Sequence, residues 1–293
     1  MSDQMISNRG LRDNAGLRLM VLFGSFCFTI GIAAAVAALL TGFAGLDERV
    51  ALLLSSVVQC VFAFCLPAWL TARFSSNTPW KWLGLETVAP FKAFVGVVIL
   101  YALVLPAMNQ LIAWNANLHF PDWASGLETT LRSWEEANGS VSEKILSYTG
   151  IGGMIATVSV VGLLTGFSEE IFFRGALQGI FQRCHISRWV AVWGAAAIFS
   201  AIHFQFFGFV PRLLMGAMFG YLFIWSGSLW LPVFAHALNN SIVVITTGIT
   251  GTENGVDTLG ISGDGEFPVA ALASAAATFL FLWRFRRYFF YKG

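Results

Sequence analysis

Residues 151–181 read IGGMIATVSVVGLLTGFSEEIFFRGALQGIF. The run up to Phe167 has no charged side chain, and Glu169, Glu170 and Arg174 then follow close together. The stretch is longer than the roughly 20 residues that a helix needs to cross a bilayer core. A charged side chain at that depth costs about 2.5–3.5 kcal/mol even on insertion scales, so such groups usually face a protein interior or a wet cavity. The stretch therefore predicts a membrane-spanning helix that carries part of a functional site.

The composition of the whole chain also indicates a membrane protein. Of its 293 residues, 57% are hydrophobic and 11% are charged, and the mean hydropathy is +0.71. Soluble domains are about 25% charged. The net charge of +1 gives no electrostatic basis for binding nucleic acid. The four cysteines lack metal-finger spacing, so neither a disulfide framework nor a zinc ribbon is predicted.

The apolar runs predict an all-α, polytopic membrane protein with about eight transmembrane helices. They cover about residues 17–40, 50–72, 91–114, 150–181, 189–206, 210–225, 229–247 and 269–288. We expect short runs such as 210–225 to cross only part of the membrane. The chain then divides into residues 1–148, with three spans and a polar segment, and residues 149–293, a catalytic core with about five spans.

The polar segment at residues 115–148 separates the third span from the fourth. Leu127, Leu131 and Trp134 recur there at helical spacing among acidic and basic side chains. This pattern predicts one or two amphipathic helices lying on the membrane surface. The alternative is a solvated connecting loop.

The basic residues predict the orientation of the spans. With eight spans and an internal N-terminus, the internal segments hold Arg9, Arg12, Arg18, Arg73, Lys81, Lys92, Arg183, Arg188, Arg284, Arg286, Arg287 and Lys292. The external segments hold only Arg49, Arg132, Lys144 and Arg212. Because cytoplasmic loops are enriched in lysine and arginine, we expect both termini to be cytoplasmic.

The helical spacing of Glu169, Glu170 and Arg174, within residues 166–179, indicates that these three charged side chains have different roles. Glu170 and Arg174 are four positions apart and share a helix face, so they can form an ion pair. Glu169 points about 100° away from Glu170. It is thus free to accept a proton as a general base. The alternative is that all three charges only hold helices together.

Two histidines and a carboxamide in later apolar runs supply further groups. His203 ends a Phe199-x-x-x-His203 pattern, and His236 shares a helix face with Asn240, which Asn239 can also approach. A carboxylate and a histidine can activate water, while a second imidazole and an amide stabilise an oxyanion. Each histidine on its own can equally be a hydrogen-bonded interhelical residue. A metal that activates the water is a further alternative, although no H-E-x-x-H or G-x-S-x-G motif is present.

Three motifs in order resemble one known family. Glu169-Glu170-x-x-x-Arg174, Phe199-x-x-x-His203 and His236-x-x-x-Asn240, with the lead-in Gly-Ser-Leu-Trp-Leu-Pro at residues 227–232, resemble the CAAX-protease and bacteriocin-processing (CPBP, or Abi) membrane endopeptidases. The resemblance covers roughly residues 150–248. It implies that Glu169 and His203 activate the attacking water and that His236 and Asn240 stabilise the tetrahedral oxyanion. Glu170 and Arg174 match the remaining motif positions, as a supporting pair.

The expected function is that of an intramembrane endopeptidase of the bacterial inner membrane acting on a peptide or membrane-protein substrate. We expect no obligatory cofactor, with a divalent metal such as zinc as the alternative. Two other functions stay open: a non-catalytic membrane immunity or partner-binding protein on the same scaffold, and a transporter or channel that uses the buried charges for proton or ion coupling.

Overall fold

The computed structural model describes residues 14–42, 45–184, 186–250 and 269–290. In these ranges the chain is helical with short connections, and it contains no strand. Seven of the described helical segments are long and apolar enough to cross a membrane. The protein is therefore a polytopic all-α membrane protein, as the sequence predicts.

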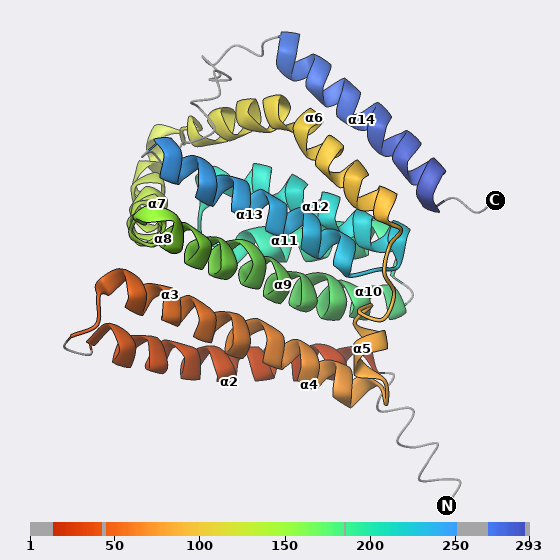
Figure 1. The fold of residues 1–293 in the computed structure, drawn as a ribbon, viewed down its shortest axis with the longest axis horizontal. Helices are drawn as coiled ribbons and strands as arrows, with labels where there is room; N and C mark the ends of the chain where they lie inside the picture. Colours follow the sequence, from red (N-terminus) through yellow and green to blue (C-terminus); the bar gives the residue numbers. More distant parts are fainter. Residues whose placement is uncertain (1–13, 43–44, 185, 251–268, 291–293) are drawn as a thin grey trace, which may run out of the picture.

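The N-terminal part is a helical hairpin followed by a further long helix. Helix α2 (Ala15–Gly42) packs along a second rod made of α3 (Glu48–Gln59), the π-helical η1 (Cys60–Cys65) and α4 (Leu66–Ser75). Asp47 caps the start of α3 by accepting a hydrogen bond from the Val50 N–H. The short α5 (Pro79–Trp82) leads to α6 (Phe91–Ala116), which packs against α14 on the opposite side of the bundle (Figure 1).

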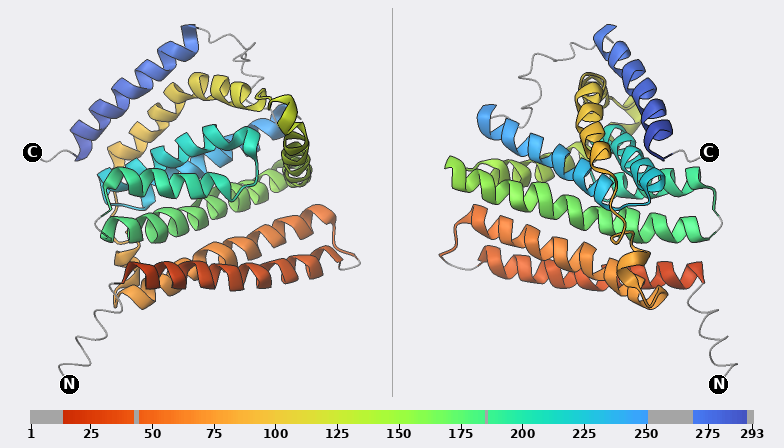
Figure 2. Two further views of the ribbon diagram at one scale, coloured as in Figure 1. Left: turned by 180° about the vertical axis from the view of Figure 1, so that it is seen from behind. Right: turned by 45° about the vertical axis from the view of Figure 1, so that its right-hand side comes forward.

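The polar segment forms a 3-10 turn, η2 (Asp122–Ala124), and one long helix, α7 (Ser125–Leu146). It is thus a helix and not a connecting loop. Helix α7 lies across one end of the bundle, near the start of α8 and the ends of α6 and α13 (Figures 1 and 2). Its position at a membrane surface stays a prediction.

The central rod runs from Gly150 to Arg183 and carries the three charges discussed above. It consists of α8 (Gly150–Thr157), η3 (Val158–Leu164), α9 (Thr165–Glu170), η4 (Ile171–Gln178) and α10 (Gly179–Arg183). Both η3 and η4 are π-helical, so the short α9 lies between two widened segments. π-helical turns inside α-helices frequently mark functional sites.

The remaining elements are α11 (Arg188–Ala201), the 3-10 turn η5 (Phe206–Gly208), α12 (Phe209–Ser226), α13 (Trp230–Thr250) and α14 (Val269–Phe290). Helix α11 has only 14 residues, and it is not among the seven segments that reach membrane-spanning length. It ends before His203 because Phe204 adopts the left-handed conformation, with φ +52°, which stops a helix. The count of eight spans stays a prediction, and α12, expected to be short, reaches spanning length.

Small residues bring the central rod close to α13. A Cβ atom on Gly166 would lie 2.9 Å from the backbone N of Ala237, so only glycine fits there without a shift. Close backbone approach at small residues is the usual way in which membrane helices associate. On the other side, Phe172 and Phe173 of η4 pack in a buried aromatic cluster with Phe64 and Phe199. These contacts place Glu169 and Glu170 beside α13 and the end of α11.

Candidate active site

Glu170 is the centre of a buried cluster of charged groups. Its side chain is 0% exposed, and its Oε1 atom accepts hydrogen bonds from Arg174 Nη1 at 2.7 Å and from His236 Nδ1 at 2.8 Å. The ion pair expected from the spacing of Glu170 and Arg174 is present. The structure adds His236 as a second partner of the same carboxylate oxygen.

Arg174 joins the central rod to α12. Its Nη2 atom donates to the Gly216 carbonyl at 2.8 Å, and its guanidinium carbon lies 4.7 Å from the centre of the Phe199 ring and 5.4 Å from that of Phe219. Both distances fall within the range of cation–π contacts. A Cβ atom on Gly216 would lie 3.2 Å from Nη2, so this glycine leaves room for the arginine. Arg174 is thus enclosed on all sides and acts as a structural anchor.

The ring of His236 is held in one orientation. A carboxylate paired with arginine can only accept hydrogen bonds, so Nδ1 carries the proton that it shares with Glu170. Phe219 stacks on the ring at 5.0 Å between centroids, and Phe199 meets it edge-on at 5.8 Å. The other ring nitrogen, Nε2, consequently faces Glu169.

Glu169 is buried but less constrained than its neighbour. Its Oε2 atom lies 3.7 Å from His236 Nε2, and its side chain is 10% exposed. That distance exceeds a normal hydrogen bond. The two adjacent glutamates therefore differ as their phasing suggests, with Glu170 tied to arginine and Glu169 held only loosely.

His203 lies in the turn after α11 rather than inside the helix. Its Nδ1 atom is 2.7 Å from the Phe199 carbonyl oxygen, which can only accept, so Nδ1 carries the proton and a neutral ring has Nε2 free to accept one. The Phe199 ring packs edge-on against His203 at 5.0 Å as well as against His236. Phe199 is thus the side chain that places the two histidines around one centre.

Asn240 lies one turn beyond His236 on α13. Its Nδ2 atom donates to the Val161 carbonyl at 3.1 Å, and its Oδ1 accepts from Asn239 Nδ2 at 3.1 Å. Asn239 in turn accepts a hydrogen bond from the Tyr101 hydroxyl. The carboxamide of Asn240 is therefore oriented by η3 and Asn239, with one amide hydrogen left for a further acceptor.

Several residues that shape this site carry no obvious chemical motif. Gly166 and Gly216 allow the close approaches described above, and glycine inside an apolar helical run is a signal for such contacts. Phe219, which stacks on His236, is one of many phenylalanines in apolar runs, and nothing local distinguishes it.

The described residues do not fit a metal centre. Within them, no group of three or more His, Cys, Asp or Glu side chains is arranged to hold a metal ion. A catalytic zinc site normally has three protein ligands. That no divalent metal is required stays a prediction, which chelation tests.

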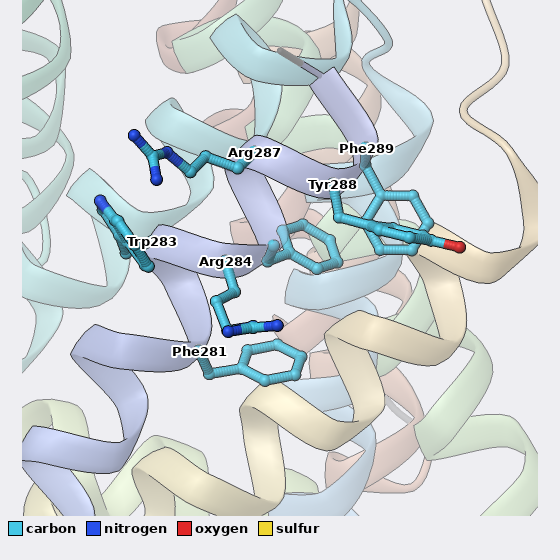
Figure 3. A pocket seen from close by; sticks show the side chains of 7 residues that line it. Phe281, Trp283, Arg284, Arg287, Tyr288 and Phe289 are labelled. Carbon is cyan, nitrogen blue, oxygen red and sulfur yellow. The ribbon is translucent and has the colours of Figure 1, made fainter.

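Two surface cavities among the described residues are lined by side chains other than those of the predicted site. One of about 630 Å³ runs along α14 and is lined by Arg284, Arg287 and five aromatic residues, none of them in the predicted site (Figure 3). The other, of about 390 Å³, is apolar and lies beside α13 next to the site. It is lined by Val88, Phe94, Leu163, Trp230, Val233, Phe234 and Ala237.

Comparisons with known proteins find similarity over the part of the chain that contains the predicted site residues. Residues 151–242 match the family model described as type II CAAX prenyl endopeptidase Rce1-like. The uncharacterized protein YpbD of Bacillus subtilis (strain 168) is 30% identical over 109 residues, which are 36% of this chain and 51% of that protein. The chain thus spans about half the length of this curated relative. No solved structure matches. The similarity to the Rce1-like type II CAAX prenyl endopeptidase family lies over residues 151–242, which include every predicted site residue.

Proposed function

We propose that the protein is an intramembrane endopeptidase in which Glu169 and His203 activate water. The observation that carries the proposal is the arrangement of His236, whose Nδ1 is bound to the buried Glu170 while its Nε2 faces the loosely held Glu169 at 3.7 Å. His236 Nε2 and Glu169 Oε2 are close enough for both to contact one molecule that lies beside them. The match to a peptidase family over the same residues supports the assignment.

The proposed reaction uses only groups of this chain and a water molecule. Glu169, assisted by His203 Nε2, takes a proton from water as the water oxygen attacks the peptide carbonyl carbon. The negative charge that develops on the carbonyl oxygen is stabilised by His236, from the side of its Nε2 atom, and by the remaining amide hydrogen of Asn240. The C–N bond then breaks, and the proton taken from water passes to the leaving amine.

The membrane setting defines the proposed substrate and orientation. The protein is an integral membrane protein, and we assign it to the bacterial inner membrane with cytoplasmic termini, which themselves lie outside the described residues. The end of α4 and the start of α6 lie at the same end of the bundle, where the sequence is rich in arginine and lysine (Figure 1). The apolar cavity beside α13 suits a hydrophobic peptide segment or a membrane-protein substrate.

The decisive experiment compares membrane proteomes of cells that contain the wild-type protein, Glu169→Gln or His203→Ala. We expect peptide termini that appear with the wild type and disappear with both variants, because each variant removes a proton acceptor. Glu136→Gln, at an exposed glutamate of α7, is the matched control and should retain cleavage. Cleavage that persists in both site variants would overturn the mechanism, and a biological activity without any cleavage would favour a membrane partner-binding protein.

A further inference from the structure

The turn that carries His203 has an unusual backbone conformation. Residues 202–208, here called the His203 loop, connect α11 to α12, and Phe204 within it has φ +52°. A bulky residue rarely adopts positive φ, because its Cβ meets the following carbonyl, and the conformation persists only when surrounding contacts impose it. Contacts from outside the loop must therefore hold His203 in place.

Helix α7 supplies several of these contacts. Glu135 Oε2 accepts a hydrogen bond from the Phe207 N–H at 3.1 Å, and Asn138 Nδ2 lies 3.4 Å from the His203 carbonyl oxygen. The Trp134 ring packs edge-on against Phe204, with 6.3 Å between centroids. Three residues of the loop, His203, Phe204 and Phe207, thus contact α7.

Helix α7 is itself anchored where it supports the loop. The Arg132 guanidinium carbon lies 3.9 Å from the centre of the Phe207 ring. Glu128 Oε1 holds Arg132 Nε at 2.9 Å, and Arg132 Nη2 donates to the Leu118 carbonyl at 2.9 Å. Arg132 thus adds a further contact from α7 to Phe207, and its own side chain is held by Glu128 and by the segment that precedes α7.

We propose that Glu135 of α7 is a positioning residue for His203. It fixes the Phe207 backbone and so keeps the loop in the conformation that presents His203 to Glu169. The inference rests on the proposed function of His203. Glu135 lies outside the matching region 151–242. Residues 151–242 alone would therefore not be a complete catalytic unit.

The charge of Glu135 must be separated from its hydrogen bond in any test. Arg212 of α12 also contacts the His203 loop, because its Nη2 donates to Gln205. A glutamine at position 135 keeps an oxygen acceptor for the Phe207 N–H but removes the charge. Glu135→Ala removes both, and Glu136→Ala is the matched control at the adjacent exposed position.

The first measurement needs no substrate. Hydrogen–deuterium exchange of peptides covering residues 202–208 is followed in the full-length protein in lipid nanodiscs. We expect Glu135→Ala to speed exchange about 10- to 100-fold, the range for losing a hydrogen bond to a charged group. Glu135→Gln, which keeps a neutral acceptor, should fall between Glu135→Ala and wild type, and Glu136→Ala should stay close to wild type. Equal exchange in Glu135→Ala and wild type would overturn the inference.

The second measurement is steady-state cleavage of a quenched fluorogenic peptide that carries the site found with the wild-type protein. We expect Glu135→Ala to lower kcat about 10- to 100-fold with little change in KM, because small misplacements of a catalytic group have effects of this size. Glu135→Gln should restore kcat. A change confined to KM, or a glutamine variant as impaired as alanine, would refute positioning through the hydrogen bond. Cleavage that survives His203→Ala would instead refute the proposed function.

Discussion

Arg174→Met removes the cation from the most deeply buried ion pair of the site. Both partners of the Arg174–Glu170 pair are 0% exposed, and their atoms are 2.7 Å apart. Methionine keeps a long apolar side chain, so the main loss is the charge and its hydrogen bonds to Glu170 and to the Gly216 carbonyl. Removing one partner of a buried pair typically costs about 3–5 kcal/mol, because the other charge stays buried and poorly compensated. We expect a loss of that size in the free energy of unfolding.

Lys144→Met is the matched control because it breaks a pair of the same length at the surface. Lys144 Nζ lies 2.7 Å from Glu48 Oε1, but the two side chains are 53% and 67% exposed. Pairs of this kind contribute about 0–1 kcal/mol. Arg174→Met and Lys144→Met therefore break ion pairs of the same length, one buried and one exposed.

The assay is denaturation of the purified protein in mixed micelles by increasing SDS, followed by tryptophan fluorescence. We expect the double variant Glu170→Gln/Arg174→Met to be more stable than Arg174→Met, because no lone charge then remains in the interior. A value for Arg174→Met within about 1 kcal/mol of Lys144→Met would refute the reasoning, since Glu170 would then not be buried as an ion.

The start of α7 is expected to loosen on acidification. The hydrogen bond from the Phe120 N–H, and then that from Arg132, lower the pKa of Glu128 to about 2. Its stabilising contribution is therefore complete above the ordinary glutamate pKa of about 4.3 and is lost as the pH falls towards 2. Faster hydrogen exchange of residues 118–132 in that window, absent in Glu128→Gln, checks this. Gly166→Ala should lower both stability and cleavage by forcing the central rod away from Ala237, whereas Gly31→Ala, with nothing within 4 Å, should be neutral or slightly stabilising in thermal unfolding. Addition of a chelator should leave cleavage unchanged, and a loss that zinc restores would contradict the metal-independent mechanism.

The features that could be predicted from the sequence alone depend only on short stretches of the chain. Hydrophobic length identifies the helices, because a bilayer demands about 20 apolar residues whatever the partners of the helix. Helical spacing predicts the Glu170–Arg174 pair and the separate direction of Glu169, since both depend only on residues within one turn. Helical spacing also predicts one or two helices within residues 115–148, where the structure has α7 (Ser125–Leu146).

Contacts between distant segments depend on which helices pack together, and no local pattern encodes them. Helical spacing places His236 and Asn240 on one helix face, but it does not reveal that His236 Nδ1 is bound to Glu170 or that Asn240 donates to the Val161 carbonyl. The end of α11 before His203, and the contact of Glu135 with Phe207, likewise arise from packing across the bundle. Periodicity therefore identified the helices and the chemical groups they carry. The partners of these groups were decided by how the helices pack. Gly166 lies against Ala237, and the Phe199 ring packs against both histidines.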